Sequence, residues 1–155
     1  MKLTFFVPGK PATQGSKRAF WRPGMKRAGL KDDCERNLPW RTDVKDAARQ
    51  MLKNMCLPDL SGYEGPVKME ITFFLLRPKA HFGSGKNAAI LKPTAPESPT
   101  KKPDMTKLVR PVEDSLKGLV WRDDSQIVET LARKVYCSEP VEEGCFVELE
   151  LKGGE

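Results

Sequence analysis

The segment VKMEITFFLLRP, residues 67–78, constrains the fold most strongly. Its apolar and polar side chains alternate strictly from Val67 to Phe73, which is the period of a β-strand with one buried face. The four residues that begin at Phe73 are all apolar, which indicates burial on both faces near the end of the strand. An opening strand is also predicted over KLTFFVP, residues 2–8, so the chain is expected to build a sheet.

Two other segments carry apolar residues at helical spacing. The first helix is predicted from residue 43 to about residue 56, with Thr42 as its N-cap. The second helix is predicted over roughly residues 105–117 and ends at Gly118. Pro111 lies inside this second helix, where a proline costs about 3 kcal/mol or more. We therefore expect either a kink at Pro111 or a later start of the helix.

The last strands are predicted over residues 126–136 and 145–151, paired as a hairpin through the acidic turn SEPVEEG. Cys137 and Cys145 flank that turn, and a disulfide between them is the alternative to free, mainly buried thiols. The four cysteines show no C-x-x-C spacing, so a zinc ribbon has no support.

The length of 155 residues fits a single domain, residues 1–155. Two long stretches rich in Pro and basic residues, at about 9–41 and 78–103, interrupt the predicted elements. Loops this long inside a compact domain are usually functional or disordered, so both are predicted to be mobile basic loops. No apolar run reaches the roughly 18 residues of a spanning helix, and the N-terminal apolar stretch is too short for a signal peptide, which favours a cytoplasmic protein.

The net charge of +6 is unevenly distributed along the chain. Residues 1–53 carry a net +8, residues 54–112 a net +4 and residues 113–155 a net −6. A basic first two-thirds favours a polyanionic partner, chiefly nucleic acid. An acidic membrane surface is less favoured because no basic amphipathic helix stands out, and a soluble protein with uneven surface charge is the remaining alternative.

Candidate chemistry lies in the stretches KKPDMTKLVR, EDSLKG and VWRDDSQIV, which contribute Asp104, Asp114, Asp123 and Asp124. Mg²⁺ prefers oxygen ligands, usually one or two carboxylates with waters and substrate phosphate. Aspartates brought together would repel one another unless a cation neutralised them. Such a site can activate a water and stabilise charge on a phosphate, which is nuclease chemistry.

Each aspartate also has a purely structural interpretation. Asp104 would be the N-cap of the second helix, Asp114 would pair with Arg110 one turn earlier, and the Asp-Asp pair would form a polar turn. His81 is the only histidine and falls in the second basic loop, where we expect it to face DNA or solvent. Histidine-based and Ser-His-Asp catalysis therefore have little support.

These segments resemble the RusA family of Holliday junction resolvases. The resemblance includes FFVPGKPATQGSKR, FFLLRPKAHFGSGKNAAILK and, most specifically, KKPDMTKLVRPVEDSLKGLVWRDDSQIV. It implies a small α+β homodimer, with a mixed sheet and two main helices packed on it. It also implies cleavage of four-way DNA junctions by paired symmetric nicks, with Mg²⁺ or Mn²⁺, in the recombination and repair of bacterial or prophage DNA.

The resemblance further implies which residues act. Asp104 matches the family's first catalytic aspartate and Asp124 its last, with Asp123 beside it, and these three are the implied metal ligands. Arg110 stands where the family has a catalytic lysine, and Lys134 matches a basic residue on the following strand. For Asp114, which matches a family aspartate on the helix, a structural role is favoured.

One departure from the family pattern concerns the motif Asp-x-Asp, which here ends in Thr106. A threonine offers a hydroxyl but no charge, and Arg110 in place of lysine changes the geometry of the cation. Both changes put turnover in doubt. The alternatives are therefore a branched-DNA-binding protein with weak or no cleavage, and a structural protein without a DNA role.

The residues expected to contact DNA are basic or lie in the basic loops: Lys17, Arg18, Lys79, His81, Lys86, Lys101, Lys102 and Lys107. They are expected to contact phosphates with little sequence readout. Phe20, Trp21 and Phe82 lie among them and would either stack on an unpaired base or belong to the core.

Overall fold

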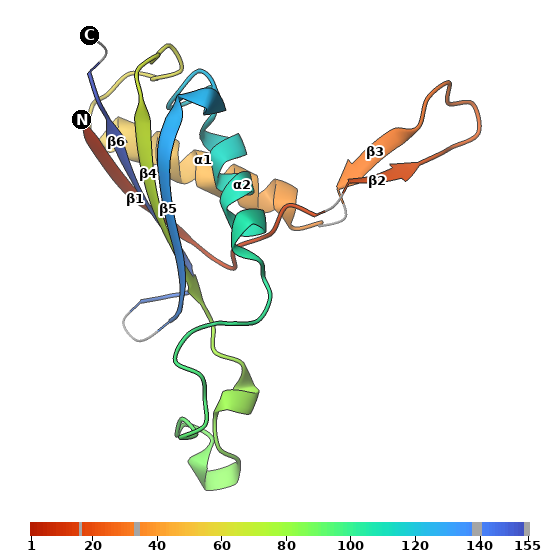
Figure 1. Cartoon of the computed structure of the whole chain (residues 1–155), viewed down its shortest axis with the longest axis vertical. Coiled ribbons are helices and arrows are strands. Elements are labelled where there is room, and N and C mark those ends of the chain that lie inside the picture. Colours follow the sequence, from red (N-terminus) through yellow and green to blue (C-terminus); the bar gives the residue numbers. More distant parts are fainter. Residues whose placement is uncertain (16, 33–34, 138–140, 154–155) are drawn as a thin grey trace.

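The computed structural model describes residues 1–15, 17–32, 35–137 and 141–153, and for residues 17–19 and 29–32 it describes the backbone only. Its centre is a four-stranded sheet of β1 (Lys2–Pro8), β4 (Val67–Leu75), β5 (Ile127–Tyr136) and β6 (Gly144–Leu151). The strand order is β1-β6-β4-β5. β4 and β5 are parallel, and the other neighbours are antiparallel (Figure 1). This mixed sheet with two main helices confirms the expected α+β fold.

The predicted pairing of the last two strands is wrong. β4 lies between β5 and β6, so Ile71 is opposite Ala132 on one side and Val147 on the other. β1, β4 and β6 each bury almost every second residue, whereas β5 has no fully buried residue and forms one edge of the sheet. The parallel β4–β5 pair requires a long crossover, and residues 76–126 provide it.

The cysteine prediction is only partly confirmed. Cys137 and Cys145 are free thiols, as is Cys56, so the alternative of a Cys137–Cys145 disulfide is wrong. Cys145 is buried, Cys137 is half-buried and Cys56 is exposed, which contradicts the expectation of mainly buried thiols. Cys34 lies outside the described residues.

Helix α1 (Asn37–Asn54) begins six residues before the predicted start at residue 43. Pro39 is tolerated in the first turn because its missing N–H would have no helical partner there. Trp40 is only 3% exposed and extends the apolar face of the helix upstream. Thr42 is therefore not the N-cap, and its hydroxyl donates to the Leu38 carbonyl inside the helix (3.1 Å).

Helix α2 (Met105–Leu116) runs through Pro111, so the alternative of a later start is wrong. Pro111 has no N–H for the carbonyl of Lys107, one turn earlier. The backbone N–H of Gln14 donates to that carbonyl instead (2.9 Å). Pro111 thus leaves the Lys107 carbonyl free to accept from Gln14, and this hydrogen bond fixes the loop after β1 to α2.

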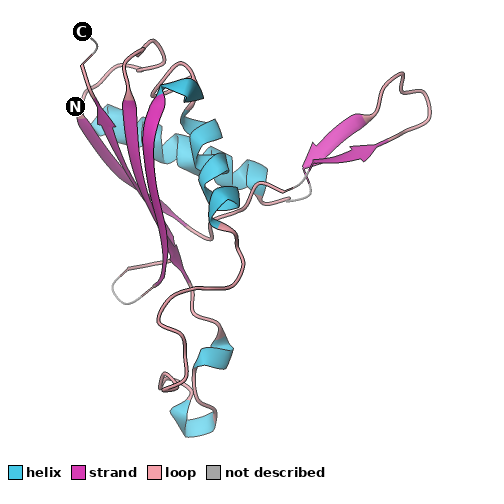
Figure 2. Ribbon diagram, in the orientation of Figure 1, coloured by secondary structure: helices cyan, strands magenta, loops and turns pink. Residues whose placement is uncertain are grey.

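Both helices cover one face of the sheet (Figure 2). The core lies between these helices and the sheet, and its largest fully buried side chains are Trp121 and Phe73. The opposite face is open, and exposed apolar residues lie on it, including Leu131. The expectation of burial on both faces at the end of β4 is only partly confirmed, because Phe74 on the second face is half-buried against Phe6 and Leu76, beyond the strand, is 63% exposed.

Two projections leave this body (Figure 1). The first is an arm formed by β2 (Lys17–Phe20) and β3 (Gly29–Asp32), which pair antiparallel. The second is the segment 76–104, with the short 3-10 helices η1 (Lys79–His81) and η2 (Gly85–Asn87). They correspond to the predicted loops at about 9–41 and 78–103, except that the first range also includes the start of α1. Their mobility stays a prediction. No helix in the described ranges is long and apolar enough to cross a membrane.

Candidate active site

The polar face of α2 forms one wall of a cavity of about 860 Å³. Thr106, Arg110 and Glu113 line it at positions i, i+4 and i+7 of the helix, a spacing that places them on one helix face. Thr130 and Ala132 of β5 also line the cavity. The loop after β1 completes the cavity, held there by the bond from Gln14 to α2.

Asp104 is at the N-cap position of α2, but its side chain makes no capping hydrogen bond. Its backbone carbonyl accepts from Leu108 (3.2 Å), while its carboxylate lies 3.7 Å from the ammonium of Lys107 and is 54% exposed. The structural interpretation of Asp104 as a side-chain cap is therefore not realised. Its carboxylate faces solvent at the positive end of the helix dipole.

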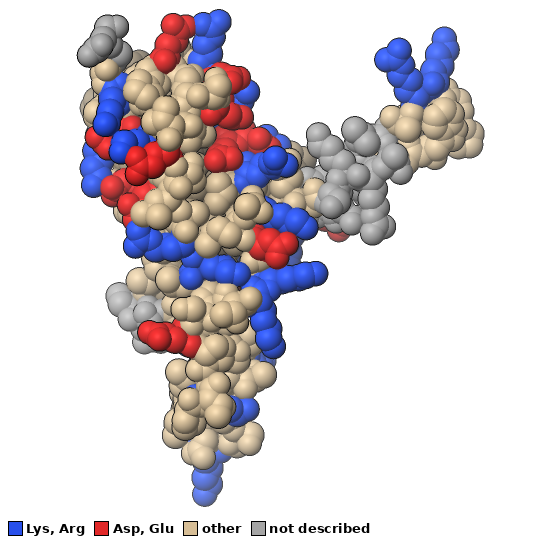
Figure 3. Space-filling model, in the orientation of Figure 1, with Lys and Arg blue, Asp and Glu red and all other residues tan. Residues whose placement is uncertain are grey.

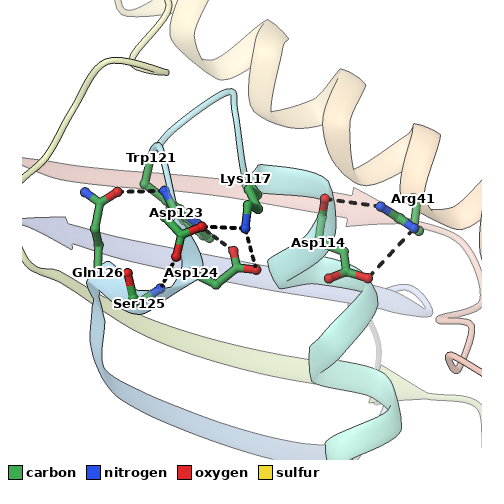
Figure 4. A network of polar contacts seen from close by, with 8 residues as sticks. All are labelled: Arg41, Asp114, Lys117, Trp121, Asp123, Asp124, Ser125 and Gln126. Carbon is green, nitrogen blue, oxygen red and sulfur yellow. Dashed lines mark hydrogen bonds and ion pairs between the residues drawn. The ribbon is translucent and has the colours of Figure 1, made fainter.

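Asp123 is held by bonds to both of its carboxylate oxygens (Figure 4). The N–H of Ser125 donates to Oδ1 (3.1 Å) and the ammonium of Lys117 to Oδ2 (2.7 Å). Gln126 accepts from the Asp123 N–H (2.7 Å), which completes a capping box for η3 (Asp124–Gln126). The hydrogen bond from Lys117, followed by those from Ser125, holds the pKa of Asp123 well below its usual range. This geometry matches the polar-turn interpretation.

Asp124 is oriented by the core. The indole N–H of Trp121, a fully buried side chain, donates to Oδ1 (3.1 Å). Oδ2 lies 3.6 Å from the ammonium of Lys117, which therefore bridges both members of the aspartate pair (Figure 4). Trp121 thus links the position of a half-buried carboxylate to the packing of the core.

Glu113 is a candidate residue that the sequence prediction missed. It is half-buried, and burial raises its pKa, with a further contribution from the negative charge of Asp124. Arg110 acts in the opposite direction. The signal was present in the sequence, because Glu113 follows Thr106 and Arg110 on the polar face of the predicted helix. The prediction considered its neighbour Asp114 instead.

Asp114 belongs to a different contact. Its carboxylate lies 3.8 Å from the guanidinium of Arg41 on α1 (Figure 4). Arg41 also donates to the Asp114 backbone carbonyl (3.3 Å). The predicted partner Arg110 is thus replaced by Arg41, and the contact joins the two helices.

The structure does not bring Asp104, Asp123 and Asp124 together. Asp104 precedes α2 and the aspartate pair follows it, and a helix of 12 residues is about 18 Å long. Among the described residues, no three His, Cys, Asp or Glu side chains form a group that could hold a metal ion. Within the described residues of one chain these three aspartates therefore form no common group, and their shared role as metal ligands stays a prediction.

A smaller ligand set does fit the residues present. Mg²⁺ needs only one or two carboxylates when waters and substrate phosphates complete its shell. Asp124 and Glu113 are two such carboxylates, and the charge of Asp124 raises the pKa of Glu113. A cation beside both would relieve this repulsion.

Lys134 acts on the segment that leads into α2. Its ammonium donates to the carbonyls of Lys101 (2.8 Å) and Pro103 (2.9 Å). This anchors the residues immediately before Asp104 to β5. The contacts indicate that Lys134 positions Asp104, whereas Arg110 is exposed in the cavity.

Comparison with known proteins identifies the family. The model of the family described as endodeoxyribonuclease RusA matches residues 8–150 of the chain. The chain belongs to the RusA family. It is also 30% identical over 141 residues to the uncharacterized protein YqaN of Bacillus subtilis (strain 168), a match that covers 89% of this chain and 90% of that protein. Membership of the RusA family supports a DNA endonuclease.

Basic side chains of this RusA-family protein gather in two places on the face that Figure 3 shows. One is the region where the segment 76–104 leaves the sheet, and the other is the tip of the β2–β3 arm. The first segment contains most of the residues predicted to contact DNA: Lys79, His81, Lys86, Lys101 and Lys102. Lys107 lies on α2 and lines the cavity, while the side chains of Lys17 and Arg18 lie outside the described residues.

The aromatic residues considered for base stacking differ in exposure. Trp21 is 64% exposed beside the β2–β3 arm, and the guanidinium of Arg22 lies 5.4 Å from the ring centre of Phe20. Phe82 is half-buried and pairs through its backbone with Leu91. Trp21 is thus the most accessible of the three for stacking on a base.

Proposed function

We propose that this protein is a metal-dependent, structure-selective endonuclease that resolves four-way DNA junctions by paired symmetric nicks. The observation that carries the proposal is the cavity wall of Thr106, Arg110 and Glu113 in a chain of the RusA family. Asp104 and Asp124 lie at the two ends of that wall. The proposed setting is the bacterial cytoplasm, on chromosomal or prophage DNA.

Each side chain of the wall has a proposed task. Arg110 binds the scissile phosphate and stabilises the negative charge that develops on it. Glu113 takes the proton of the attacking water at its carboxylate, while the water oxygen bonds to phosphorus and the oxygen of the broken P–O bond leaves and takes a proton from solvent. Asp124 and Glu113 would hold Mg²⁺ or Mn²⁺, which supplies positive charge beside the phosphate and makes water a better nucleophile. Lys134 keeps Asp104 in place.

The paired nicks require two such sites. A two-fold homodimer presents two identical cavities to a junction that is itself two-fold symmetric. The basic residues of the segment 76–104 and the β2–β3 arm bind phosphates on the flanking DNA arms. Affinity for the junction is then expected to fall steeply with salt concentration.

A second candidate function is branched-DNA binding with weak or no cleavage. Two observations favour it: Thr106 replaces a family aspartate, and no three-carboxylate cluster forms within the described residues. This protein would bind a junction with the same salt dependence but would leave its strands intact at every concentration of divalent metal.

One assay distinguishes these functions. A labelled four-way junction and a matched duplex are incubated with the protein, with and without Mg²⁺ or Mn²⁺. Asp104→Asn and Asp124→Asn are compared with Asp46→Asn, a control at an exposed aspartate of α1. Symmetric nicks in the wild type and the control, lost in Asp124→Asn with binding retained and weakened or moved along the strand in Asp104→Asn, support the endonuclease.

Other outcomes are equally informative. Equal nicking by all variants would place the catalytic site elsewhere. Binding without nicking in the wild type would favour the second candidate. An absence of salt-sensitive binding to the junction would leave a structural protein without a DNA role.

A further inference from the structure

A second cavity, of about 440 Å³, lies where the segment 76–104 meets the end of the sheet. Pro11, Leu75 and Pro99 are buried side chains that line it. His81 and Tyr136 add two rings to its lining. The cavity has the size and the mainly apolar surface of a small-molecule site, and no task in the proposed mechanism uses it.

Its walls are held in place by specific contacts. The guanidinium of Arg77 lies 4.3 Å from the ring centre of Tyr136 and donates to the carbonyl of Pro96 (2.9 Å). His81 meets Tyr136 edge to face, with ring centres 5.5 Å apart. Lys92 donates to the carbonyl of Ala80 (2.9 Å). These contacts close the segment on itself and hold the cavity open before any ligand binds.

The polar groups of the cavity suit a nucleotide. Lys10, Lys101 and Lys102 line it and are exposed, as a phosphate site requires. Glu143 lines it too, and a carboxylate accepts hydrogen bonds from the amino groups of nucleobases. Nδ1 of His81 is buried and has no hydrogen-bond partner among the described residues. Because this nitrogen has almost no accessible surface, His81 contributes its ring, and not this atom, to the lining of the cavity.

The cavity also adjoins the candidate active site. Pro103 lines the second cavity, and Met105, two residues further on, lines the first. Asp104 therefore lies between the two cavities along the chain. The bonds from Lys134 to the carbonyls of Lys101 and Pro103 fix this boundary.

We propose that the second cavity binds one unstacked nucleotide of the DNA strand that enters the active site. Its base lies among the prolines and the rings of His81 and Tyr136, and its phosphate contacts the lysines. The inference rests on the proposed function, because the nucleotide belongs to the same branched DNA. Near a branch point, bases are unpaired at a lower cost than inside a duplex, so such a cavity contributes to the preference for junctions.

The test measures binding that depends on a base. A fluorescent four-way junction is titrated with the protein in EDTA, so that no strand is cut. The titration is repeated with each nucleotide near the branch point replaced, one at a time, by an abasic unit. The variants are Ala80→Phe, which places a ring at the cavity lining, and Ala88→Phe, a control at an exposed alanine of the same segment outside the cavity. Nicking of the unmodified junction is measured separately.

For the wild type and Ala88→Phe, we expect one abasic position to weaken binding about fivefold or more, since a stacked base contributes about 1–3 kcal/mol. Ala80→Phe should bind the unmodified junction correspondingly more weakly and lose nothing further at that abasic position. A full abasic effect in Ala80→Phe, or none in the wild type, would overturn the proposal.

The two proposals fail in different ways in this experiment. Nicking without any dependence on a base leaves the endonuclease and removes the nucleotide site. A base-dependent affinity without nicking leaves the nucleotide site and removes the endonuclease. A lack of junction binding would overturn both.

Discussion

Two buried tryptophans of this protein differ in one hydrogen bond. The indole N–H of Trp121 donates to Asp124 (3.1 Å), whereas that of Trp40 is buried without a partner among the described residues. Both side chains are almost fully buried, at 0% and 3% exposed. The variants Trp121→Phe and Trp40→Phe therefore remove the same atoms from similarly buried sites. They differ because the N–H lost at Trp121 is hydrogen-bonded, whereas the N–H lost at Trp40 has no partner among the described residues.

The expected magnitudes follow from this difference. Loss of packing costs about 1–2 kcal/mol at either site. At Trp40 the change also removes an unsatisfied buried N–H, and this relief of about 1–3 kcal/mol offsets the loss. At Trp121 it removes a bond to a charged group, about 1.5–3 kcal/mol, with the lower end applying because the Asp124 side chain is 39% exposed. The free energy of unfolding should fall by about 3 kcal/mol for Trp121→Phe and change by about 1 kcal/mol or less for Trp40→Phe.

Urea unfolding followed by far-ultraviolet circular dichroism measures both values, at one protein concentration because the proposed dimer couples stability to concentration. Junction nicking is measured alongside. Trp121→Phe should lower the nicking rate more than the junction affinity, because Asp124 loses its orientation. Equal destabilisation by the two variants, with equal nicking, would refute the assignment of Trp121 as the residue that positions Asp124.

Three further outcomes are expected. Lys117 lowers the pKa of Asp123 in the folded protein. Their contact therefore stabilises the fold at pH values above the ordinary pKa of an aspartate, and this stabilisation is lost as the pH falls through the lowered pKa of Asp123. Melting temperatures of wild type and Lys117→Met should therefore differ at neutral pH and converge in strong acid. Glu113 has a raised pKa, so its ionisation opposes folding as the pH rises. Glu113→Gln should raise the melting temperature at neutral pH and lower nicking by about a hundredfold or more. Thr106→Asp should leave the metal affinity unchanged, because Thr106 lies about two helical turns from Glu113, and a higher affinity in a metal titration would place the ion at the Asp104 end of α2 instead.

Local patterns were sufficient to predict most elements of the fold. The alternation of β4 and the apolar face of α2 predicted where both elements begin, and their ends to within three residues. The start of α1 was missed because Thr42 was predicted to be the N-cap, although the helix begins at Asn37 and a proline such as Pro39 fits the first turn of a helix. Periodicity shows which residues face the core and says nothing about which strand lies beside which. The predicted β5–β6 hairpin failed for that reason.

The site was predicted less completely than the fold. The polar face of α2 was available from helical spacing, and Glu113 could have been found there. The anchoring of Lys101 by Lys134 joins residues 33 positions apart, which sequence spacing does not reveal. The bond from Trp121 to Asp124 is local, but it depends on the burial of Trp121 in the core. Sequence spacing also placed Asp104 close to Asp124 only because it took no account of the length of the helix between them.

That length determines how a DNA strand can meet the site. Phosphates follow one another at about 3.4 Å along the axis of one strand, so a helix about 18 Å long extends over roughly five phosphates. When a strand runs along α2, the carboxylates of Asp104 and Asp124 therefore meet different phosphates, with Arg110 between them. In the proposed mechanism, the scissile phosphate lies at the end near Asp124 and Glu113, where two carboxylates would share a cation. Asp104 then acts on the flanking nucleotides, beside the second cavity. Asp104→Asn should consequently change junction affinity or the position of the cut more than Asp124→Asn does, whereas Asp124→Asn should chiefly lower the rate.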